Sequence, residues 1–464
     1  MGLPSSVTMR AREPQSAPRP GGAWELATAG APRFSISSSR PWLGLFGLLA
    51  TVLLIVMSAS QSRSLIPQSL RDVPQSLRPV PGFIAAAFGS FGLDIGVPGL
   101  IVLMGLMFIS YALAIGASNR MSRRTVLISI GALNAIVLLA PPLMSTDLFS
   151  YIAYGRLGAT YGINPYLHGP NVIWFDPLYR FVGSQWTSTP TVYGPLFTAL
   201  SYSLASLGIA ANVFVYKAIA ALSCLVLVLL VWHAARLRGL DPIKAVALVG
   251  LNPVIVVYGV GGGHNDLLMA AILVAAIYVL LRHREGTGGA MIVAATAVKL
   301  TAGVLLPFAV AAGAGRRLTS VRRSRILAGA AIAAALLGVF GAVMFGAGPL
   351  NLLATLSGVQ GGGGLHSIPG FILTAVGLGK LTGPTDVVLQ AGYAVGLVWL
   401  IRDVWIGKLD WITAAGWATV GLLVTAGLLM PWYVVWLIPL AALSSDRRLR
   451  IAAIVLTCLG LTTL

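Results

Sequence analysis

The chain has 464 residues, of which 57% are hydrophobic and only 9% are charged. So few charged residues could not cover the surface of a soluble domain of this length, and the composition therefore excludes that class. The formal net charge of +18 suggests a nucleic-acid partner, but the basic residues cluster in short connectors between apolar runs. That bias is typical of cytoplasmic loops. We predict an all-α polytopic membrane protein that contacts membrane lipid and binds no nucleic acid.

The N-terminal residues 1–40 are rich in Pro, Ser, Ala and Arg, and this composition predicts a disordered cytoplasmic tail. The apolar run that follows is too long for a cleaved signal peptide and is expected to stay as a signal anchor. Residues 41–464 are predicted to form one multi-span membrane domain. The two cysteines, Cys224 and Cys458, lie within apolar runs and are expected to be buried thiols.

The apolar runs predict roughly a dozen transmembrane or re-entrant helices, because each crossing of a hydrocarbon core of about 30 Å needs about 20 apolar residues. The basic connectors between the runs are predicted to lie on the cytoplasmic side, and this orients the helices. Residues 194–208 are predicted to be interfacial or re-entrant, and 288–314 to form a hairpin of two half-spans, because basic residues flank both of its ends. The predicted crossings are 41–60, 97–116, 125–144, 211–232, 244–258, 267–281, 326–347, 386–401, 411–430, 434–444 and 451–464.

This topology places four polar or glycine-rich segments on the outer side of the membrane. They are residues 61–96, a large extracytoplasmic loop at about 145–193, the turn 259–266 and the glycine-rich loop 348–385. The basic loops alone set the topology, yet most of the candidate functional residues fall in these segments.

Asp147 follows a long apolar run and begins a polar, aromatic-rich stretch, STDLFSYIAYGRLGATYGINPY. A carboxylate at the end of a span is not needed to cross a bilayer, and we assign it a catalytic role. At helical spacing Asp147, Tyr151 and Tyr154 share one face, and a carboxylate beside aromatic rings suits a sugar. A structural interpretation stays open, because Asp147 could cap a helix and the tyrosines could form an interfacial belt.

Three further residues of the same region, Arg156, Asn164 and Tyr193, are predicted to bind substrate. Arg156 is also a candidate for binding a lipid phosphate. The surrounding sequences YGINPY and TVYGP are equally typical of rigid turns.

His264, Asn265 and Asp266 follow three glycines in GVGGGHND. Glycines permit a close approach of the backbone to a ligand, and we predict that these three side chains bind substrate. Asp266 could instead cap the next helix. No pair of potential ligands has the spacing of a zinc site, so no metal site is predicted, and dependence on a divalent metal is left open.

Lys299 falls near the turn of the 288–314 hairpin, and a lysine at membrane depth marks a functional site. We assign it to lipid phosphate, although a lysine can also extend its amine to the membrane surface. His366, in GGGGLHSIPG, and the pair Trp432 and Tyr433 are predicted to bind substrate. The alternatives are an ordinary loop position for His366 and an aromatic belt for the pair.

The ordered set STDLFSYIAYGRLGATYGINPY, TVYGPLF, GGGHNDLLM, AVKLTAG and MPWYVVWLIPL resembles one family over about residues 140–440. It is similar to the polyprenol-phosphomannose-dependent α-(1→6)-mannosyltransferases of mycobacteria and corynebacteria, which build the mannan backbone of lipomannan and lipoarabinomannan. The resemblance implies a GT-C fold whose first large outer loop holds an acidic catalytic residue, the position of Asp147. It also implies polyprenyl-phosphate-mannose as donor and a lipid-anchored mannan as acceptor. The resemblance does not extend to the tail 1–40, and the number of final spans is open.

A β-linked donor and an α-linked product require inversion by one direct displacement at the anomeric carbon. The acceptor C6 hydroxyl is a poor nucleophile, so a carboxylate acting as general base, Asp147, should accelerate attack by about 10²–10⁴. The departing lipid phosphate needs charge stabilisation, for which Lys299, Arg156 and His264 are candidates. A secondary transporter is the main alternative function, because transporters also contain broken helices and intramembrane charges. A lipid-linked glycan flippase or polymerase is a third.

Overall fold

The computed structural model describes Gly2 and residues 41–61, 93, 95–312, 319–361, 367–377 and 383–462. The regular elements in these ranges are all helices, which confirms the predicted all-α class. The predicted tail 1–40, apart from Gly2, lies outside the described residues, as do His366 and most of the predicted outer loop 61–96.

The helices follow one another along the chain with many breaks, and their bounds are as follows. The first half contains α1 (Pro41–Gln61), α4 (Gly96–Gly116), η2 (Ser118–Arg120), α5 (Arg123–Leu139), α6 (Asp147–Ala159), η3 (Pro170–Ile173), η4 (Tyr179–Phe181), η5 (Ser184–Trp186), α7 (Pro195–Leu204), α8 (Ile209–Leu237), α9 (Pro242–Gly250) and η6 (Val254–Val260). The second half contains α10 (Asp266–Leu281), α11 (Glu285–Thr296), η7 (Leu300–Val304), α12 (Leu305–Ala311), α13 (Thr319–Phe345), η8 (Gly348–Asn351), α14 (Leu352–Gly361), α15 (Ile368–Ala375), α16 (Gly383–Trp405), α17 (Trp411–Thr425), η10 (Pro431–Trp436), α18 (Ile438–Ala442) and α19 (Arg447–Thr462).

Five helices in the described ranges are long and apolar enough to cross a membrane, namely α1, α4, α8, α13 and α16. A sixth crossing is possible if α9 and the π-helix η6, which meet at a bend of 48°, count as one span. Most side chains of α13 and α16 are exposed although they are apolar, as expected of helices that face lipid. The other apolar helices, including α10 and α17, are shorter.

Several predicted boundaries were wrong, for local reasons. The span predicted at 125–144 ends as a helix at Leu139, because Pro141 and Pro142 cannot continue it. The predicted outer loop 348–385 contains the short helices α14 and α15. The crossing predicted at 434–444 is a 3₁₀ turn followed by the five-residue helix α18.

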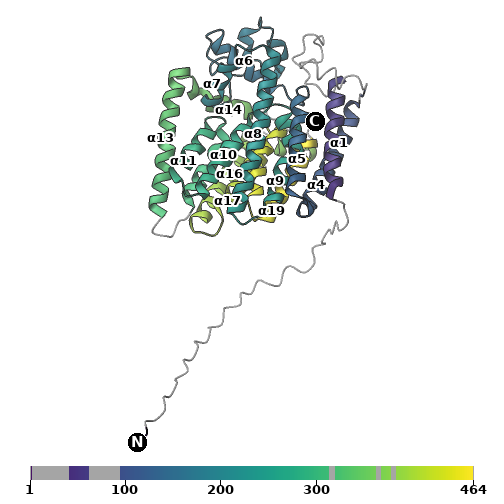
Figure 1. Ribbon diagram of the computed structural model, residues 1–464. Helices are drawn as coiled ribbons and strands as arrows, with labels where there is room; N and C mark the ends of the chain where they lie inside the picture. The colour runs from purple at the N-terminus through teal and green to yellow at the C-terminus, as the bar shows by residue number, and fades with distance from the viewer. Residues whose placement is uncertain are drawn as a thin grey trace. The chain divides into compact units, whose positions relative to one another are not determined.

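The region after α5 gathers at one end of the helical unit, where α6 and α7 lie beyond α8, α10 and α11 (Figure 1). The ten-residue α7 is too short to cross a bilayer, consistent with the interfacial helix predicted at 194–208. It packs on α6 and on α13, where Tyr202 meets Phe345 edge to face with 5.2 Å between ring centroids.

A buried polar network fixes the break between α9 and η6. The Asn252 Oδ1 accepts from the backbone N–H groups of Val254 and Ile255, and its Nδ2 donates to the Tyr111 and Thr457 hydroxyls, each at 3.0 Å. Each polar group of the Asn252 side chain is thereby satisfied in an apolar setting. The break is therefore held rigidly against α4 and α19.

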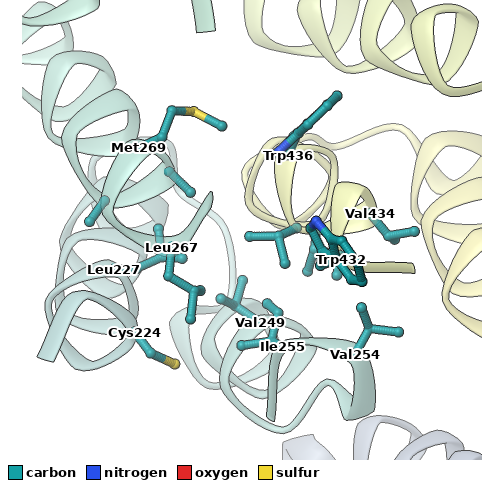
Figure 2. Packing of buried hydrophobic residues seen from close by; sticks show 14 of the residues in the cluster. Cys224, Leu227, Val249, Val254, Ile255, Leu267, Met269, Trp432, Val434 and Trp436 are labelled. Carbon is teal, nitrogen blue, oxygen red and sulfur yellow. The ribbon is translucent and has the colours of Figure 1, made fainter. Parts of the chain in front are cut away.

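The apolar core continues on both sides of this break (Figure 2). Val249 and Ile255 lie beside Leu267 of α10, and Val254 lies below Trp432. All are buried. The segments that precede and follow the 261–265 turn are consequently packed into the core, and the turn between them is well anchored.

Candidate active site

Asp147 is the first residue of α6, reached through an irregular stretch that follows the two prolines. Met144 in this stretch adopts φ +59°, an uncommon left-handed conformation for a residue other than glycine. The Asp147 N–H donates to the Ser145 Oγ at 3.2 Å, and Thr146 occupies the cap position without a side-chain cap bond. The Asp147 side chain is 13% exposed, so its carboxylate can meet a substrate.

The glycine turn 261–263 brings His264 to this carboxylate. Gly263 has φ +68°, which favours glycine, and a Cβ at Gly261 would lie 2.2 Å from the Val257 carbonyl oxygen. The Leu143 N–H donates to the Gly261 carbonyl at 3.1 Å, which joins the Asp147 stretch directly to the turn. A Cβ at Gly261 would also lie 2.8 Å from the Leu143 Cδ1, so the packing of the two loops favours glycine at this position.

His264 lies at the centre of the resulting cluster. Its Nδ1 is 3.7 Å from Asp147 Oδ2, 4.0 Å from Asp266 Oδ2 and 3.5 Å from the Tyr151 hydroxyl oxygen. Its ring is completely buried and stacks on Trp432, with 4.0 Å between centroids. One imidazole nitrogen therefore faces two carboxylates.

Asp266 and Lys299 form an ion pair beside His264. The Lys299 Nζ donates to Asp266 Oδ1 at 2.6 Å, and the Trp436 Nε1–H donates to the same oxygen at 2.5 Å. Lys299 also lies over the rings of Tyr433 and Trp436, at 4.8 and 5.1 Å from their centroids. The two rings stack at 4.4 Å, so the ammonium is surrounded by one carboxylate and an aromatic wall.

The segment that contains Lys299 is fixed by the TVYGP motif. The Gly194 N–H donates to the Val298 carbonyl at 3.1 Å, and the Leu196 N–H donates to the Ala297 carbonyl at 3.0 Å. A Cβ at Gly194 would lie 2.2 Å from the Ala297 oxygen, so only glycine permits this approach. These two hydrogen bonds join the segment that follows Tyr193 to the residues just before Lys299, which connect α11 to η7.

Tyrosine side chains close the other side of the cluster. The Tyr151 and Tyr193 rings meet edge to face at 4.9 Å. The Tyr154 hydroxyl donates to the Thr189 carbonyl at 2.9 Å. These buried rings supply flat apolar faces next to Asp147, of the kind on which a sugar ring can stack.

Burial and nearby charge set the protonation of Asp147 and His264. Burial, opposed by the positive charge of Lys299, raises the pKa of Asp147 to about 7. Burial and the same ammonium hold the pKa of His264 well below its ordinary value. The imidazole is therefore neutral at pH 7, whereas Asp147 can exchange a proton near neutrality.

Several buried polar atoms of the cluster have no hydrogen-bond partner in the described part of the chain. They are His264 Nε2, Asp266 Oδ2, Trp432 Nε1 and both amide atoms of Asn265. Buried polar groups are almost always paired, so an unpaired set of donors and acceptors is a candidate surface for a hydroxyl-rich ligand. Among the described residues, no three His, Cys, Asp or Glu side chains are arranged to hold a metal ion.

Two predicted site residues lie outside the cluster. The Arg156 Nη1 pairs with Asp176 Oδ1 at 2.7 Å, and Asp176 also accepts from the Tyr161 hydroxyl. The Asn164 Nδ2 donates to the Phe345 carbonyl at 2.7 Å. Both side chains hold the outer loop together, and neither is joined to Asp147 by any contact that the described residues show.

Two residues beside the cluster were missed by the sequence analysis. Trp436 binds Asp266, and the repeated aromatic spacing of PWYVVW could have indicated it. Lys217 lies in α8, completely buried, and its Nζ donates to the carbonyls of Ala140 and Pro141 just before the Asp147 stretch. A single lysine in an otherwise uncharged apolar run was the available signal.

Comparisons with known proteins identify relatives of the chain. A family model described as alpha-(1->6)-mannopyranosyltransferase, N-terminal domain, matches residues 44–315, and a model of glycosyltransferase family 87 matches residues 191–464. Alpha-(1->6)-mannopyranosyltransferase A of Mycobacterium tuberculosis is 35% identical over 184 residues, which cover 38% of this chain and 34% of that protein. The protein of the same name from Corynebacterium glutamicum is 31% identical over 180 residues, covering 38% and 36%.

A longer match covers more of the chain at lower identity. Alpha-(1->6)-mannopyranosyltransferase B of Corynebacterium glutamicum is 26% identical over 404 residues, covering 75% of this chain and 65% of that protein. In the two matches of higher identity, the chain spans about a third of the relative's length. No solved structure matches the chain significantly.

Proposed function

The chain belongs to the alpha-(1->6)-mannopyranosyltransferase family, and on this premise we propose that it is a membrane mannosyltransferase. In this proposal it transfers mannose from polyprenyl-phosphate-mannose to a growing α-(1→6)-mannan, the backbone of lipomannan and lipoarabinomannan. The match to glycosyltransferase family 87 and the helical architecture support a GT-C type of fold. The main support from the site is the partly exposed Asp147 carboxylate, which lies 3.7 Å from a buried, neutral histidine.

Asp147 acts as the general base. It accepts the proton of the acceptor C6 hydroxyl while that oxygen attacks the anomeric carbon, and the configuration inverts. A base is most effective when its pKa lies near the working pH, and burial raises the pKa of Asp147 to about 7. The hydrogen bond from the Asp147 N–H to Ser145 helps to fix the start of α6, and the Tyr151 hydroxyl helps to position His264.

Lys299 stabilises the departing lipid phosphate. The bond that breaks joins the anomeric carbon to the phosphate oxygen, so negative charge develops on the phosphate. Lys299 is 12% exposed and pairs with Asp266, which holds the ammonium in one position. A fixed cation in a site that excludes water stabilises such charge without reorganisation.

The sugar rings bind between two aromatic walls. Tyr151, Tyr154 and Tyr193 form one wall, and Trp432 with Tyr433 forms the other. The unpaired atoms of His264, Asn265 and Asp266 supply hydrogen bonds to hydroxyl groups in this proposal. His366 is retained as a substrate-binding candidate from the sequence alone.

The reaction is placed on the extracytoplasmic face of the plasma membrane. The placement rests on the distribution of basic loops, which assigns the 145–193 loop and the 259–266 turn to the side opposite the arginine clusters. The donor and the lipid-anchored acceptor mannan would both be membrane-bound partners.

The direct test is transfer of labelled mannose from polyprenyl phosphate to a short α-(1→6)-mannoside in membranes that contain the protein. Wild type should transfer, and Asp147→Asn should lose about 10²–10⁴ of the rate. Asp403→Asn is the matched control, because its exposed pair with Arg402 is remote in sequence from the cluster. No transfer by a folded wild type would favour the transporter or flippase alternatives.

A further inference from the structure

Three arginines lie near the start of α13, at the end of the helical unit opposite α6 and α7. Phe345, the last residue of α13, contacts α7, and the 27 residues of the helix put its first turns about 40 Å away (Figure 1). These turns contain Arg322, Arg323 and Arg325. The first two are half-buried and the third is exposed. The proposed reaction, at the α6 end of the molecule, gives these side chains no role.

The three arginines have no acidic partner in the ranges that the structure describes. Two acids of neighbouring segments already have basic partners. The Glu285 Oε1 of α11 is 3.9 Å from the His283 Nδ1, and the Asp403 Oδ1 of α16 is 3.2 Å from the Arg402 Nη1. A partly buried cation without a counter-charge has a desolvation cost that nothing offsets. The arginines are therefore complementary to an anion from outside the chain.

The Arg323 guanidinium is held in one orientation by Trp405, the last residue of α16. Its Cζ lies 3.7 Å from the centroid of the indole ring. Stacking uses the face of the guanidinium and leaves the N–H donors at its edges. Nε and Nη2 share one edge, and this is the edge with which an arginine can bind two oxygens of one phosphate.

The donors on that edge are unpaired. Arg323 Nε and Nη2, together with Arg322 Nε, are shielded from water and have no hydrogen-bond partner among the described residues. Shielded donors are almost always paired in folded proteins, and a charged donor without an acceptor is especially costly. Three such donors on adjacent arginines indicate an acceptor with several oxygens.

The helices beside the arginines face lipid. Most side chains of α13 and α16 are exposed although they are apolar, among them Leu327 and Ile332 of α13 and Val398 and Trp399 of α16. Trp405 is itself exposed, as is typical of tryptophan at the boundary between hydrocarbon and water. An anion that carries hydrocarbon chains could use both the arginines and these apolar surfaces, whereas a soluble anion could use only the arginines.

We propose that Arg322 and Arg323, the latter held by Trp405, bind the phosphate of an anionic phospholipid whose acyl chains lie along α13 and α16. On the predicted topology this lipid belongs to the cytoplasmic leaflet, because the basic connectors lie on that side. Basic pockets between membrane-spanning helices on the cytoplasmic side are typical sites for anionic headgroups. The site is remote from Asp147 and does not depend on the proposed reaction.

The first test is competition between two phospholipids for the purified protein. Native mass spectrometry of wild type in an equimolar mixture should show phosphatidylglycerol retained about tenfold over phosphatidylcholine. Arg322→Gln/Arg323→Gln should retain the two lipids equally. Arg236→Gln/Lys244→Gln is the matched control, because it removes the same charge from two exposed positions around the α8–α9 connection and should keep the preference of wild type.

Thermal unfolding distinguishes a lipid site from a structural role. A ligand that binds the folded state raises the unfolding midpoint, so wild type should unfold at a higher temperature with phosphatidylglycerol than with phosphatidylcholine. Arg322→Gln/Arg323→Gln should have the same midpoint in both lipids, and in phosphatidylcholine it should be no lower than that of wild type, because a neutral amide replaces each unpaired cation. An equal drop of the midpoint in both lipids would mean that the arginines only hold the helices together, and would overturn the assignment.

Inorganic phosphate tests whether the hydrocarbon chains contribute. Excess phosphate at constant ionic strength should leave the retention of phosphatidylglycerol by wild type nearly unchanged. Displacement of the lipid by an equal concentration of phosphate would indicate a site for the free anion and would overturn the lipid assignment. Equal retention of the two lipids by wild type, or an unchanged preference in Arg322→Gln/Arg323→Gln, would overturn it as well.

Discussion

Replacing Lys299 by methionine tests stability and chemistry with one change. It removes the partner of Asp266, whose side chain is completely buried, and leaves the carboxylate with the Trp436 Nε1–H as its remaining donor in the described residues. Removing one member of a buried ion pair costs about 3–5 kcal/mol, because the other charge stays buried without compensation. Lys299→Met should therefore lower the free energy of unfolding by about that amount.

The double variant Lys299→Met/Asp266→Asn separates the two effects. The neutral amide can still accept from Trp436, so stability should return to within about 1 kcal/mol of wild type. Transfer should stay about 10²–10³ below wild type, because the cation opposite the departing phosphate is still missing. The exposed Lys244→Met is the control for the substitution itself.

Thermal unfolding in detergent and labelled-mannose transfer measure these two quantities. Near-normal transfer by the stable double variant would refute the role of Lys299 in the reaction. An unchanged unfolding midpoint in the single variant would refute the ion-pair argument.

Three further outcomes follow from the geometry. Because the pKa of Asp147 is raised to about 7, kcat/KM should fall about tenfold per pH unit below 7, where the carboxyl is protonated, and should be level above 7. A kcat/KM that stays constant from about pH 5.5 to about 8.5 would contradict the assignment of Asp147 as the base. Gly194→Ala should reduce the transfer rate about a hundredfold, because the new Cβ would force the Ala297 segment and Lys299 away. Gly396→Ala is the control: it has open space around it and should leave the transfer rate unchanged. Lys217→Met leaves the Ala140 and Pro141 carbonyls unpaired and should lower kcat more than it changes KM. A larger change in KM than in kcat would contradict this expectation.

The sequence allowed the helical class and the gathering of several site residues to be predicted. Basic loops orient the spans, and this orientation alone put Asp147, the 259–266 turn and Trp432 on one side. In the structure His264 lies against both Asp147 and Trp432. Hydrophobic length and charge are local properties, so they can be counted along the chain.

The pairings within the site could not be predicted in the same way. Arg156 had several possible partners, and only the fold shows that Asp176 takes it. The sequence did not single out Trp436, because its bond to Asp266 depends on the packing of η10 against α10. Short helices such as α14 were missed because a glycine-rich, weakly polar segment has no clear period.

We propose Asp147 as the base of a mannosyl transfer from a lipid phosphate. The most direct measurement is the rate of labelled-mannose transfer from polyprenyl phosphate by purified wild type and Asp147→Asn, at equal amounts of folded protein. We expect transfer by wild type and a loss of at least about a hundredfold in the variant. Equal rates in the two proteins would contradict it.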